Sequence, residues 1–347
     1  MKEAFLALVR LGIGNAITNS LPDRIDWDAV EAHAKQHGLW GVVYDGVVCH
    51  AVANDGTALL PLATKLRWIG EVTQVYEAYY AQYRKAVIEL ADFYHAHGFR
   101  MMVLKGMACG INWPKPEHRP YGDIDIYQFG QYKEADAVLN RELGIKIDNS
   151  HHHHTVFEWQ GFTVENHYDF VNVHVHKSSR EIETVLKELA SQTLNEEVPP
   201  NLHALFLIRH MVSHFTGASM SLRQVLDWGF FVKAHHEEVD WPWLFEVLDK
   251  YHMKEFLDCV NAICVEDLGF NCIPLSAYSL PLKERILNDI LEPEFSEQSP
   301  KHILKRVPFK YRRWKANKWK RELCYVDSQL RTLLGGVWNH MLKPAGI

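Results

Sequence analysis

Strand-like patterns occur in only one stretch of this chain, between residues 99 and 176, and this limits the fold more than any other feature. On both sides of the stretch, apolar residues recur every three or four positions, which is the spacing of amphipathic helices. The 347 residues are about twice the length expected of one domain. We therefore expect an α+β protein with a helical region over residues 1–98, a small sheet over 99–176, and a larger helical region over 177–347.

The two helical regions contain recognisable helix boundaries. Asp26 is suited to be an N-cap residue and Gly38 to be a helix stop, which predicts a helix between them. A longer pattern with one apolar face runs from Leu60 to about His97. Beyond the sheet region, the same periodicity predicts helices at Leu202–Phe215, Leu222–His235, Trp241–Tyr251 and Glu255–Leu268.

The sheet region contains four strand-like segments and one helical segment. Alternation of acidic and apolar residues is the period of a half-buried strand. Gln160 and Gly161 form the turn of a predicted hairpin. The predicted strands are Met101–Leu104, Asp123–Tyr127, Thr155–Trp159 and Phe162–His167, with a helix at Tyr132–Leu143.

The composition is that of a folded globular protein, because 47% of the residues are hydrophobic and 23% are charged. No apolar run approaches the roughly 18 residues that span a bilayer, and the apolar N-terminus lacks a cleavage site. The six cysteines are scattered without regular spacing, which favours reduced thiols. These features predict a cytoplasmic protein without a transmembrane segment.

Charge is unevenly distributed along the chain. Residues 301–321, the basic segment, contain ten lysines and arginines and no acidic residue. Because the whole chain has a net charge of −6, the rest of the chain has a net charge of −16. The aromatic residues between these cations can contact nucleic acid or an anionic membrane surface. A helix that packs its aromatic residues inward explains the pattern equally well, and these residues are Phe309, Tyr311, Trp314 and Trp319.

Asp123 and Asp125 are the most informative acidic residues of the sheet region. Residues two apart on a strand point to the same face, so both carboxylates leave one side while Ile124 and Ile126 enter the core. Such a pair attracts hard divalent cations like Mg²⁺, which keep positions open for the phosphates of a substrate. The pair alone is weak evidence, because most acidic pairs of this kind belong to solvated strand faces.

Two further segments strengthen the argument. The strand that ends at Leu104 is followed by Lys105 and Gly106, and a glycine there lets backbone N–H groups approach an anion. Glu165 adds a third carboxylate on the hairpin strand. The sequence thus supplies three acids and a phosphate cradle.

These segments resemble the motifs of an uncharacterised branch of the nucleotidyltransferase superfamily, whose members share the palm of DNA polymerase beta. The resemblance covers roughly residues 1–270 and is most specific over 103–127. It implies a small mixed-sheet palm embedded between N-terminal helices and a larger C-terminal helical region. The matching segments are Leu104-Lys105-Gly106, Arg119-Pro120-Tyr121-Gly122-Asp123-Ile124-Asp125, Glu165-Asn166-His167, and His214 with Leu222–Asp227.

The resemblance implies transfer of a nucleoside monophosphate from a nucleoside triphosphate to an acceptor hydroxyl, with Mg²⁺ or Mn²⁺ as cofactor. Asp123, Asp125 and Glu165 are the implied catalytic residues and metal ligands. The acceptor is a protein, an RNA end or a small molecule, and cleft shape decides between them. The implied nucleotide-binding residues are Lys105, Gly106, Met107, Arg119, His167, His214 and Arg223.

Met107 departs from the family pattern, because the superfamily usually has a serine after the glycine. The missing hydroxyl removes one ligand of the triphosphate, and Lys105, Arg119 or Arg223 could supply compensating charge. The departure keeps open a non-catalytic protein that uses the palm to bind nucleotide. A nucleic-acid-binding protein that uses the basic segment is a further alternative.

Three other groups of polar residues receive structural interpretations. His151–His154 is a run of four histidines, for which we expect a solvated loop near the active site, with transition-metal binding only if two rings converge. His210 and His214 have the i, i+4 spacing of metal ligands but lack the glutamate of the zinc-protease motif, so packing is expected for His210. Asp227 follows Arg223 by four residues, and we expect these two to pair.

Overall fold

The computed structural model describes residues 2–15, 21–22, 24–53, 60–174, 176–297, 300, 302–328 and 332. The tail of the predicted C-terminal helical region, residues 333–347, lies outside this set, as do Lys301 and the side chains of residues 303–305 in the basic segment. The described elements confirm an α+β fold in which a small mixed sheet, central in the chain, is flanked by helices.

Helices make up most of the described chain, and none of these helices is long and apolar enough to cross a bilayer. The N-terminal elements are α1 (Lys2–Gly12), α2 (Trp27–His37), α3 (Trp40–Ala53), α4 (Leu62–Glu71), the π-helical η1 (Val72–Glu77) and α5 (Ala78–Ala96). The sheet region contains β1 (Met102–Val103), α6 (Met107–Gly110), the 3₁₀ turn η2 (Pro116–His118), β2 (Ile124–Tyr127), α7 (Tyr132–Leu143), β3 (His154–Trp159) and β4 (Phe162–His167). The C-terminal elements are α8 (Lys177–Ser191), α9 (Pro200–Gly217), α10 (Leu222–His235), α11 (Trp241–Lys250), α12 (Lys254–Ala262), the π-helical η3 (Ile263–Asp267), α13 (Leu280–Leu291), α14 (Ile303–Ala316) and α15 (Lys318–Cys324).

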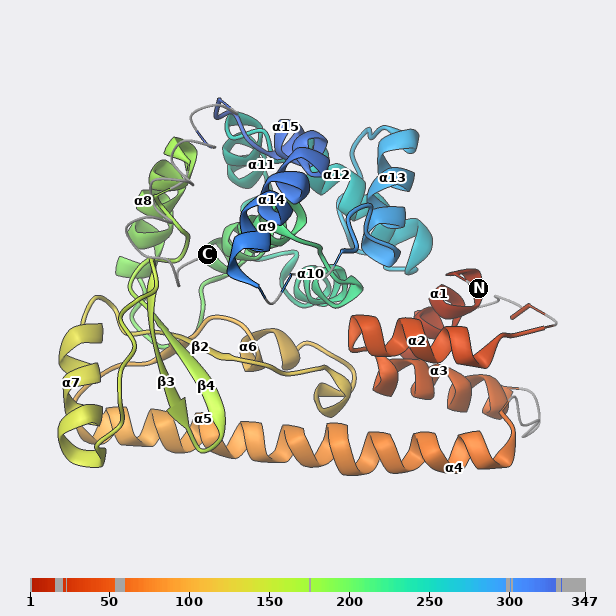
Figure 1. Ribbon diagram of the computed structural model, residues 1–347, viewed down its shortest axis with the longest axis horizontal. Coiled ribbons are helices and arrows are strands. Elements are labelled where there is room, and N and C mark those ends of the chain that lie inside the picture. The colour runs from red at the N-terminus through yellow and green to blue at the C-terminus, as the bar shows by residue number, and fades with distance from the viewer. Residues whose placement is uncertain are drawn as a thin grey trace.

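Local sequence signals account for the predicted helix boundaries. The Asp26 carboxylate accepts a hydrogen bond from the backbone N–H of Ala29 at 3.1 Å, and Gly38 ends α2 with a φ of 68°. Helices α4, η1 and α5 follow one another without a break, which confirms the predicted pattern from Leu60 to about His97. This long helix runs along the bottom of the molecule in Figure 1, beneath the sheet.

Helix α3 has no amphipathic pattern, because it is apolar on nearly all sides and most of its first half is buried. Glycines bring it into backbone contact with α1: a Cβ atom on Gly46 would lie 2.0 Å from the carbonyl oxygen of Leu8. A buried helix of this kind gives no periodic signal, and the sequence therefore does not reveal its boundaries.

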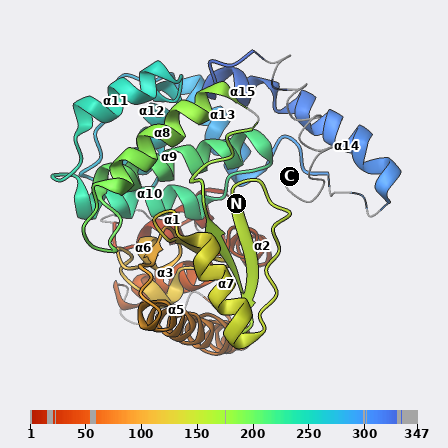
Figure 2. The ribbon, with the colours of Figure 1, turned by 90° about the vertical axis from the view of Figure 1, so that its left-hand side faces the viewer.

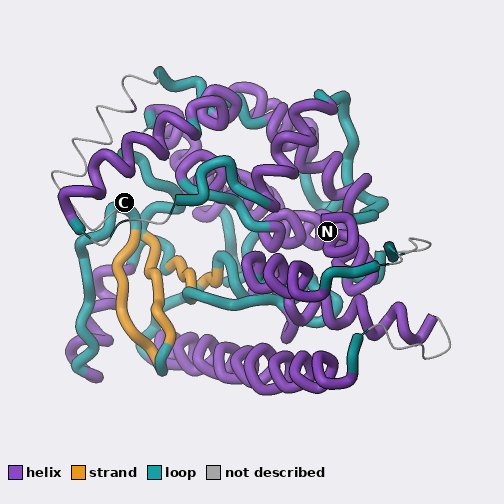
Figure 3. Tube along the Cα trace, turned by 45° about the vertical axis from the view of Figure 1, so that its right-hand side comes forward, coloured by secondary structure: helices purple, strands orange, loops and turns teal. Residues whose placement is uncertain are grey.

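The four strands form one sheet in the order β1-β2-β4-β3, coloured orange in Figure 3. β1 pairs antiparallel with β2, β2 pairs parallel with β4, and β4 pairs antiparallel with β3. The turn between β3 and β4 has positive φ values at both central residues, 50° at Gln160 and 85° at Gly161, as a two-residue hairpin turn requires. The predicted hairpin is therefore confirmed.

The two faces of the sheet have different surroundings. Ile124, Ile126 and Val164 point to one face, where they pack with α5 and α7 in an apolar cluster. Asp125 and Glu165 alternate with these residues and point to the other face, which is turned toward α9 and α10 (Figure 1). The alternation of apolar and acidic side chains along these strands therefore places the apolar residues in the core and the acidic residues at the candidate site.

The basic segment forms two helices, and α14 extends away from the body of the molecule in Figure 2. Phe309 is buried and Trp314 and Trp319 are half-buried, but 56% of Tyr311 is exposed. Inward packing of all four aromatic residues is therefore wrong for Tyr311. The two ends of the segment also differ in burial, because Lys320 on α15 is fully buried and its Nζ lies 2.5 Å from Asp289 Oδ2.

We predict that Lys320→Met destabilises the protein by about 3–5 kcal/mol, because the Asp289 carboxylate would remain buried without its cation. Lys315→Gln, at an exposed position of α14, is the matched control and should change the free energy of unfolding by less than about 0.5 kcal/mol. Urea unfolding of both variants at neutral pH measures the difference. Equal stability of the two variants would contradict the buried ion pair.

Candidate active site

Two neighbouring strands position the predicted carboxylates. In the parallel register of β2 and β4, Asp125 lies directly opposite Glu165, so their side chains share one face of the sheet. Asp123 lies one residue before β2 and is exposed. The sheet therefore brings together acids that are forty residues apart in the sequence.

Two cationic side chains hold the Asp125 carboxylate. Lys105 Nζ lies 2.7 Å from Asp125 Oδ1, and His167 Nε2 lies 3.1 Å from the same oxygen. His167 Nε2 also lies 3.6 Å from Glu165 Oε2. Only 4% of Asp125 and 3% of His167 is exposed. The buried negative charge is therefore compensated by a lysine from the turn after β1 and a histidine from the end of β4.

The charges in this cluster shift one another's pKa values. Burial acts to raise the pKa of Asp125, but Lys105 and the hydrogen bond with His167 hold it well below its ordinary value. Hydrogen bonds with Asp125 and Glu165 overcome the burial of His167 and raise its pKa to about 9. Burial and the charges of Glu165 and Asp125 raise the pKa of Asp123. An added cation would relieve the repulsion among these acids.

A cleft of about 140 Å³ opens beside Asp125, between the sheet region and helices α9 and α10. Glu165 and His167 adjoin it on the neighbouring strand through their contacts around Asp125. The other predicted site residues that line the cleft are Lys105, Gly106, Arg119, Asp123, His214 and Arg223.

Gly106 shapes the turn that leads into α6. Its φ is 58°, and a Cβ atom at this position would lie 2.3 Å from the Tyr83 hydroxyl oxygen. The same hydroxyl donates a hydrogen bond to the backbone carbonyl of Asp123 at 3.0 Å. Tyr83 belongs to α5, so the long helix holds the turn after β1 close to the loop before β2, and only glycine fits between them.

The two arginines of the cleft have different partners. Arg119 donates from Nε and Nη2 to the two carboxylate oxygens of Asp227, at 2.8 and 2.9 Å. Trp113 Nε1 donates to Asp227 at 2.9 Å. The predicted pair of Asp227 with Arg223 is therefore wrong. Asp227 pairs with the loop residue Arg119 because two parallel hydrogen bonds are stronger than a single contact with the i, i+4 neighbour Arg223. Spacing in the sequence does not reveal a pair between such distant residues.

Arg223 is left with weak contacts. Its Nη1 donates to the Pro120 carbonyl at 3.5 Å, its Nε is buried without a hydrogen-bond partner, and it forms no ion pair within the described ranges. Burial lowers its pKa, and the positive charge of Arg119 adds to the shift. A half-satisfied guanidinium in a cleft is suited to an anionic ligand.

Met107 does not line the cleft, and unlike Glu165 and His167 it is not tied to the lining by a contact around Asp125. It packs against the apolar cluster around Tyr83, so this position offers the cleft only its backbone. His214 lines the cleft from α9, together with His210. Their ring centroids are 4.4 Å apart, so His210 packs as expected and also faces the cleft.

The histidines before β3 do not form a solvated loop. Only 4% of His152 and 6% of His154 is exposed, and His153 is half-buried. The His153 carbonyl accepts hydrogen bonds from two backbone N–H groups just after β4, at 3.0 and 3.1 Å. These bonds extend the hairpin beyond the predicted start of β3 at Thr155 and bury the run against the site. Continuing the register of the Gln160-Gly161 turn by one residue would have placed His154 opposite His167.

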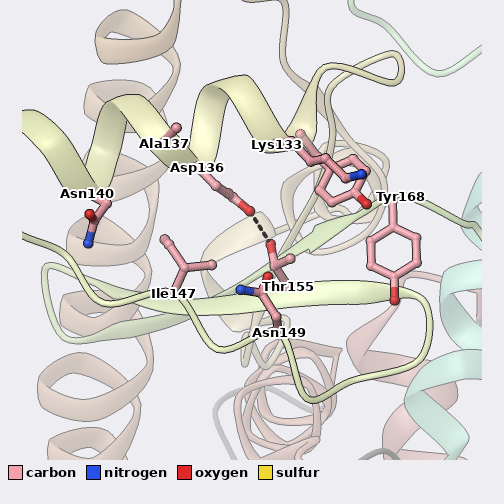
Figure 4. A pocket seen from close by; sticks show the side chains of 9 residues that line it. Lys133, Asp136, Ala137, Asn140, Ile147, Asn149, Thr155 and Tyr168 are labelled. Carbon is pink, nitrogen blue, oxygen red and sulfur yellow. Dashed lines mark hydrogen bonds between the residues drawn. The ribbon is translucent and has the colours of Figure 1, made fainter.

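A second pocket, of about 610 Å³, lies on the other face of the sheet beside α7 (Figure 4). Asp136 lines it, and its carboxylate accepts hydrogen bonds from Thr155 Oγ1 at 2.7 Å and from Asn166 Nδ2 at 2.9 Å. Tyr168 stands at one side of the pocket in Figure 4, and its ring centroid lies 4.8 Å from that of Tyr132, which also lines the pocket. The acid of this pocket is satisfied by the protein itself, and no predicted site residue lines it.

Within the part of the chain that the structure describes, two groups of side chains are close enough to hold a cation. Asp125, Glu165 and His167 offer ligand atoms within 4.8 Å of one another, and so do His153, His154 and His167. The first group, with Asp123 nearby, contains the predicted carboxylates, whose mutual repulsion suits a hard divalent cation. Among the described residues, the sequence predicts Asp125 and Glu165 of the first group as metal ligands but His167 only as a nucleotide-binding residue. For the histidine run it predicts metal binding only if two rings converge.

Comparison with known proteins supports the motif-based interpretation. The profile of a family described as uncharacterised nucleotidyltransferases matches residues 23–269, which is more than half of the chain and includes the whole cleft. No curated protein and no solved structure matches the chain. With its L-K-G turn, its paired aspartates and this match over 23–269, the chain belongs to the uncharacterised nucleotidyltransferase family.

Proposed function

We propose that the protein transfers a nucleoside monophosphate from a nucleoside triphosphate to an acceptor hydroxyl, in a reaction that requires Mg²⁺ or Mn²⁺. The observation that carries this proposal is the register of β2 and β4, which sets Asp125 opposite Glu165 beside a cleft. Family membership supports the reaction class, and the donor set supports the dependence on a metal.

Asp123, Asp125 and Glu165 would hold the metal. When bound, the ion neutralises phosphate charge and aligns the attacking and leaving oxygens. The raised pKa of Asp123 supports this role, because partial burial and the charges of Glu165 and Asp125 outweigh the nearby cations. Asp123 also forms no ion pair within the described ranges. Lys105 and protonated His167 keep Asp125 ionised, and thus able to act as a ligand.

Arg223 and Lys105 would contact the phosphates of the nucleotide. Both residues line the cleft, and the buried Nε of Arg223, which has no hydrogen-bond partner, can donate to a phosphate oxygen. The turn at Gly106 brings backbone N–H groups to the same wall, and His214 lines the cleft from α9. Arg119 would act indirectly, because its bond to Asp227 holds α10 against the loop before β2.

Glu165 would activate the acceptor. Burial acts to raise its pKa, but the hydrogen bond with His167 lowers the pKa below its ordinary value and keeps the carboxylate ionised. An ionised carboxylate beside the metal ligand Asp125 can take the proton of an acceptor hydroxyl. The non-catalytic alternative rests on the missing hydroxyl at Met107, and it predicts nucleotide binding without transfer by the wild type.

We predict that Asp123→Asn abolishes the Mg²⁺-dependent part of nucleotide binding without loss of stability, because this exposed acid forms no ion pair within the described ranges and is repelled by Glu165 and Asp125. Asp125→Asn should abolish the same binding and also lower stability, since it leaves Lys105 and His167 without their partner. Thermal unfolding with and without Mg²⁺ and nucleotide measures both effects. Asp92→Asn, at an exposed position of α5, is the control and should keep the full ligand-induced shift. A full shift in Asp123→Asn would remove that residue from the metal site.

Glu165→Gln should lower the rate of nucleotide transfer by about 100-fold or more while nucleotide affinity falls much less, because proton abstraction acts mainly in the transition state. Single-turnover kinetics and titration calorimetry separate the two quantities. Equal losses in rate and affinity would reduce Glu165 to a metal ligand, and an unchanged rate would remove Glu165 from the catalytic residues.

The two cleft arginines should respond oppositely to substitution by methionine. Arg223→Met should leave stability unchanged or raised, because it removes a half-satisfied buried cation, and should weaken nucleotide binding by about tenfold or more. Arg119→Met should lower stability by about 3–5 kcal/mol, because Asp227 would lose its bidentate partner. Chemical unfolding and nucleotide titration test both variants. Unchanged nucleotide affinity in Arg223→Met would exclude it from phosphate binding.

A further inference from the structure

Three histidine rings converge at one end of the β3–β4 hairpin. His154 lies directly opposite His167 in the antiparallel register, and His153 precedes His154. The ring centroids of His153 and His154 are 4.4 Å apart, and they lie 5.5 and 5.1 Å from the centroid of His167. One nitrogen of each ring lies within 4.8 Å of the other two. The three rings therefore form one compact cluster.

Several of these nitrogens have no hydrogen-bond partner. Only 6% of His154 is exposed, and neither of its ring nitrogens is hydrogen-bonded, nor is Nδ1 of His153. Most buried polar atoms in proteins are hydrogen-bonded, so a group of unpartnered nitrogens that face one another needs an explanation. A bound cation would satisfy several of them at once.

Glu165 adds an anionic donor to the three rings. Its Oε1 lies 3.7 Å from His154 Nε2, and its Oε2 lies 3.6 Å from His167 Nε2. Imidazole nitrogens with a carboxylate are ligands that Zn²⁺ and related transition metals prefer, whereas Mg²⁺ prefers oxygen ligands. Ligand bonds of about 2.0–2.2 Å require the rings to draw together slightly, which side-chain rotation permits.

We propose that His153, His154 and His167, together with Glu165, bind a divalent transition-metal ion such as Zn²⁺, which displaces the Nε2 proton that His167 otherwise donates to Asp125. This site is distinct in chemistry from the carboxylate centre, because it is built mainly from nitrogen and does not include Asp123 or Asp125. The two sites share Glu165 and His167, so they are neighbours. The inference goes beyond nucleotide transfer, because it depends on neither a nucleotide nor Mg²⁺.

The histidine run supplies its own control. A flexible run of histidines binds transition metals through whichever rings are exposed, and every member then contributes. In this structure, the ring of His151 lies against His154, with 4.7 Å between the centroids, but His151 is not among the residues whose nitrogens meet. A built site therefore depends on His153 and His154 and does not depend on His151.

The test is titration of the full-length, untagged, chelator-treated protein with Co²⁺, a spectroscopic substitute for Zn²⁺, in excess Mg²⁺ and without nucleotide. We expect one Co²⁺ per chain, the intense visible bands of a site with few ligands, and displacement by Zn²⁺. His153→Gln and His154→Gln should each weaken binding on the order of 100-fold. His151→Gln and Asp123→Asn should bind Co²⁺ as the wild type does.

Each other outcome overturns the proposal. Absence of stoichiometric binding by the wild type, or unchanged affinity in His153→Gln, removes the site. Equal weakening by His151→Gln shows binding by a flexible run, and loss in Asp123→Asn places the ion at the carboxylate centre. Circular dichroism checks the folding of every variant, and His153→Gln decides if the buried His154→Gln variant fails to fold, because His153 is only half-buried.

Discussion

The structure depends above all on the buried negative charge of Asp125. A carboxylate with 4% exposure is costly unless cations and hydrogen bonds compensate it. Its two partners, Lys105 and His167, come from the turn after β1 and from the last residue of β4. The charge is therefore compensated only when β1, β2 and β4 lie side by side in the observed order. Charge compensation at Asp125 therefore requires the same strand order that the sheet has.

A second buried pair extends this arrangement to the C-terminal helices. Arg119 lies in the loop before β2 and holds Asp227 of α10 through two hydrogen bonds. Tyr83 of α5 ties the same loop to the turn at Gly106 from the other side. The loop is therefore fixed between the long helix and α10. This placement leaves Arg223 facing the cleft with an unsatisfied guanidinium, as a site for an anionic substrate requires.

The sequence predicts the parts of the fold and site that follow from local patterns. Alternation over Asp123–Tyr127 predicts both the strand and the face of its carboxylates, and the turn at Gln160 and Gly161 predicts the hairpin. The boundaries of helix α3 cannot be predicted from periodicity, because the helix is apolar on nearly all sides. The ion pair of Asp227 with Arg119 cannot be predicted, because residue spacing carries no information on ion pairs between distant segments.

The histidines show where prediction could have gone further. We expect a solvated loop from the sequence because its pattern places the start of β3 at Thr155. The register of the hairpin, continued by one residue, instead pairs His154 with His167 on β4. The nucleotide-binding roles of Lys105, His214 and Arg223 remain predictions that the cleft supports. These roles depend on a ligand, and neither periodicity nor packing specifies one.

The proposed transfer of a nucleoside monophosphate at the Asp125 centre can be measured in one assay. The protein is incubated with Mg²⁺ or Mn²⁺ and each of the four nucleoside triphosphates, labelled at either the α- or the γ-phosphorus, with total RNA, protein and a metabolite extract as acceptors. We expect that the α label of at least one nucleotide is transferred, that pyrophosphate is released, and that Asp125→Asn abolishes both. Transfer of the γ label, or α-label transfer that survives in Asp125→Asn, would contradict the proposal.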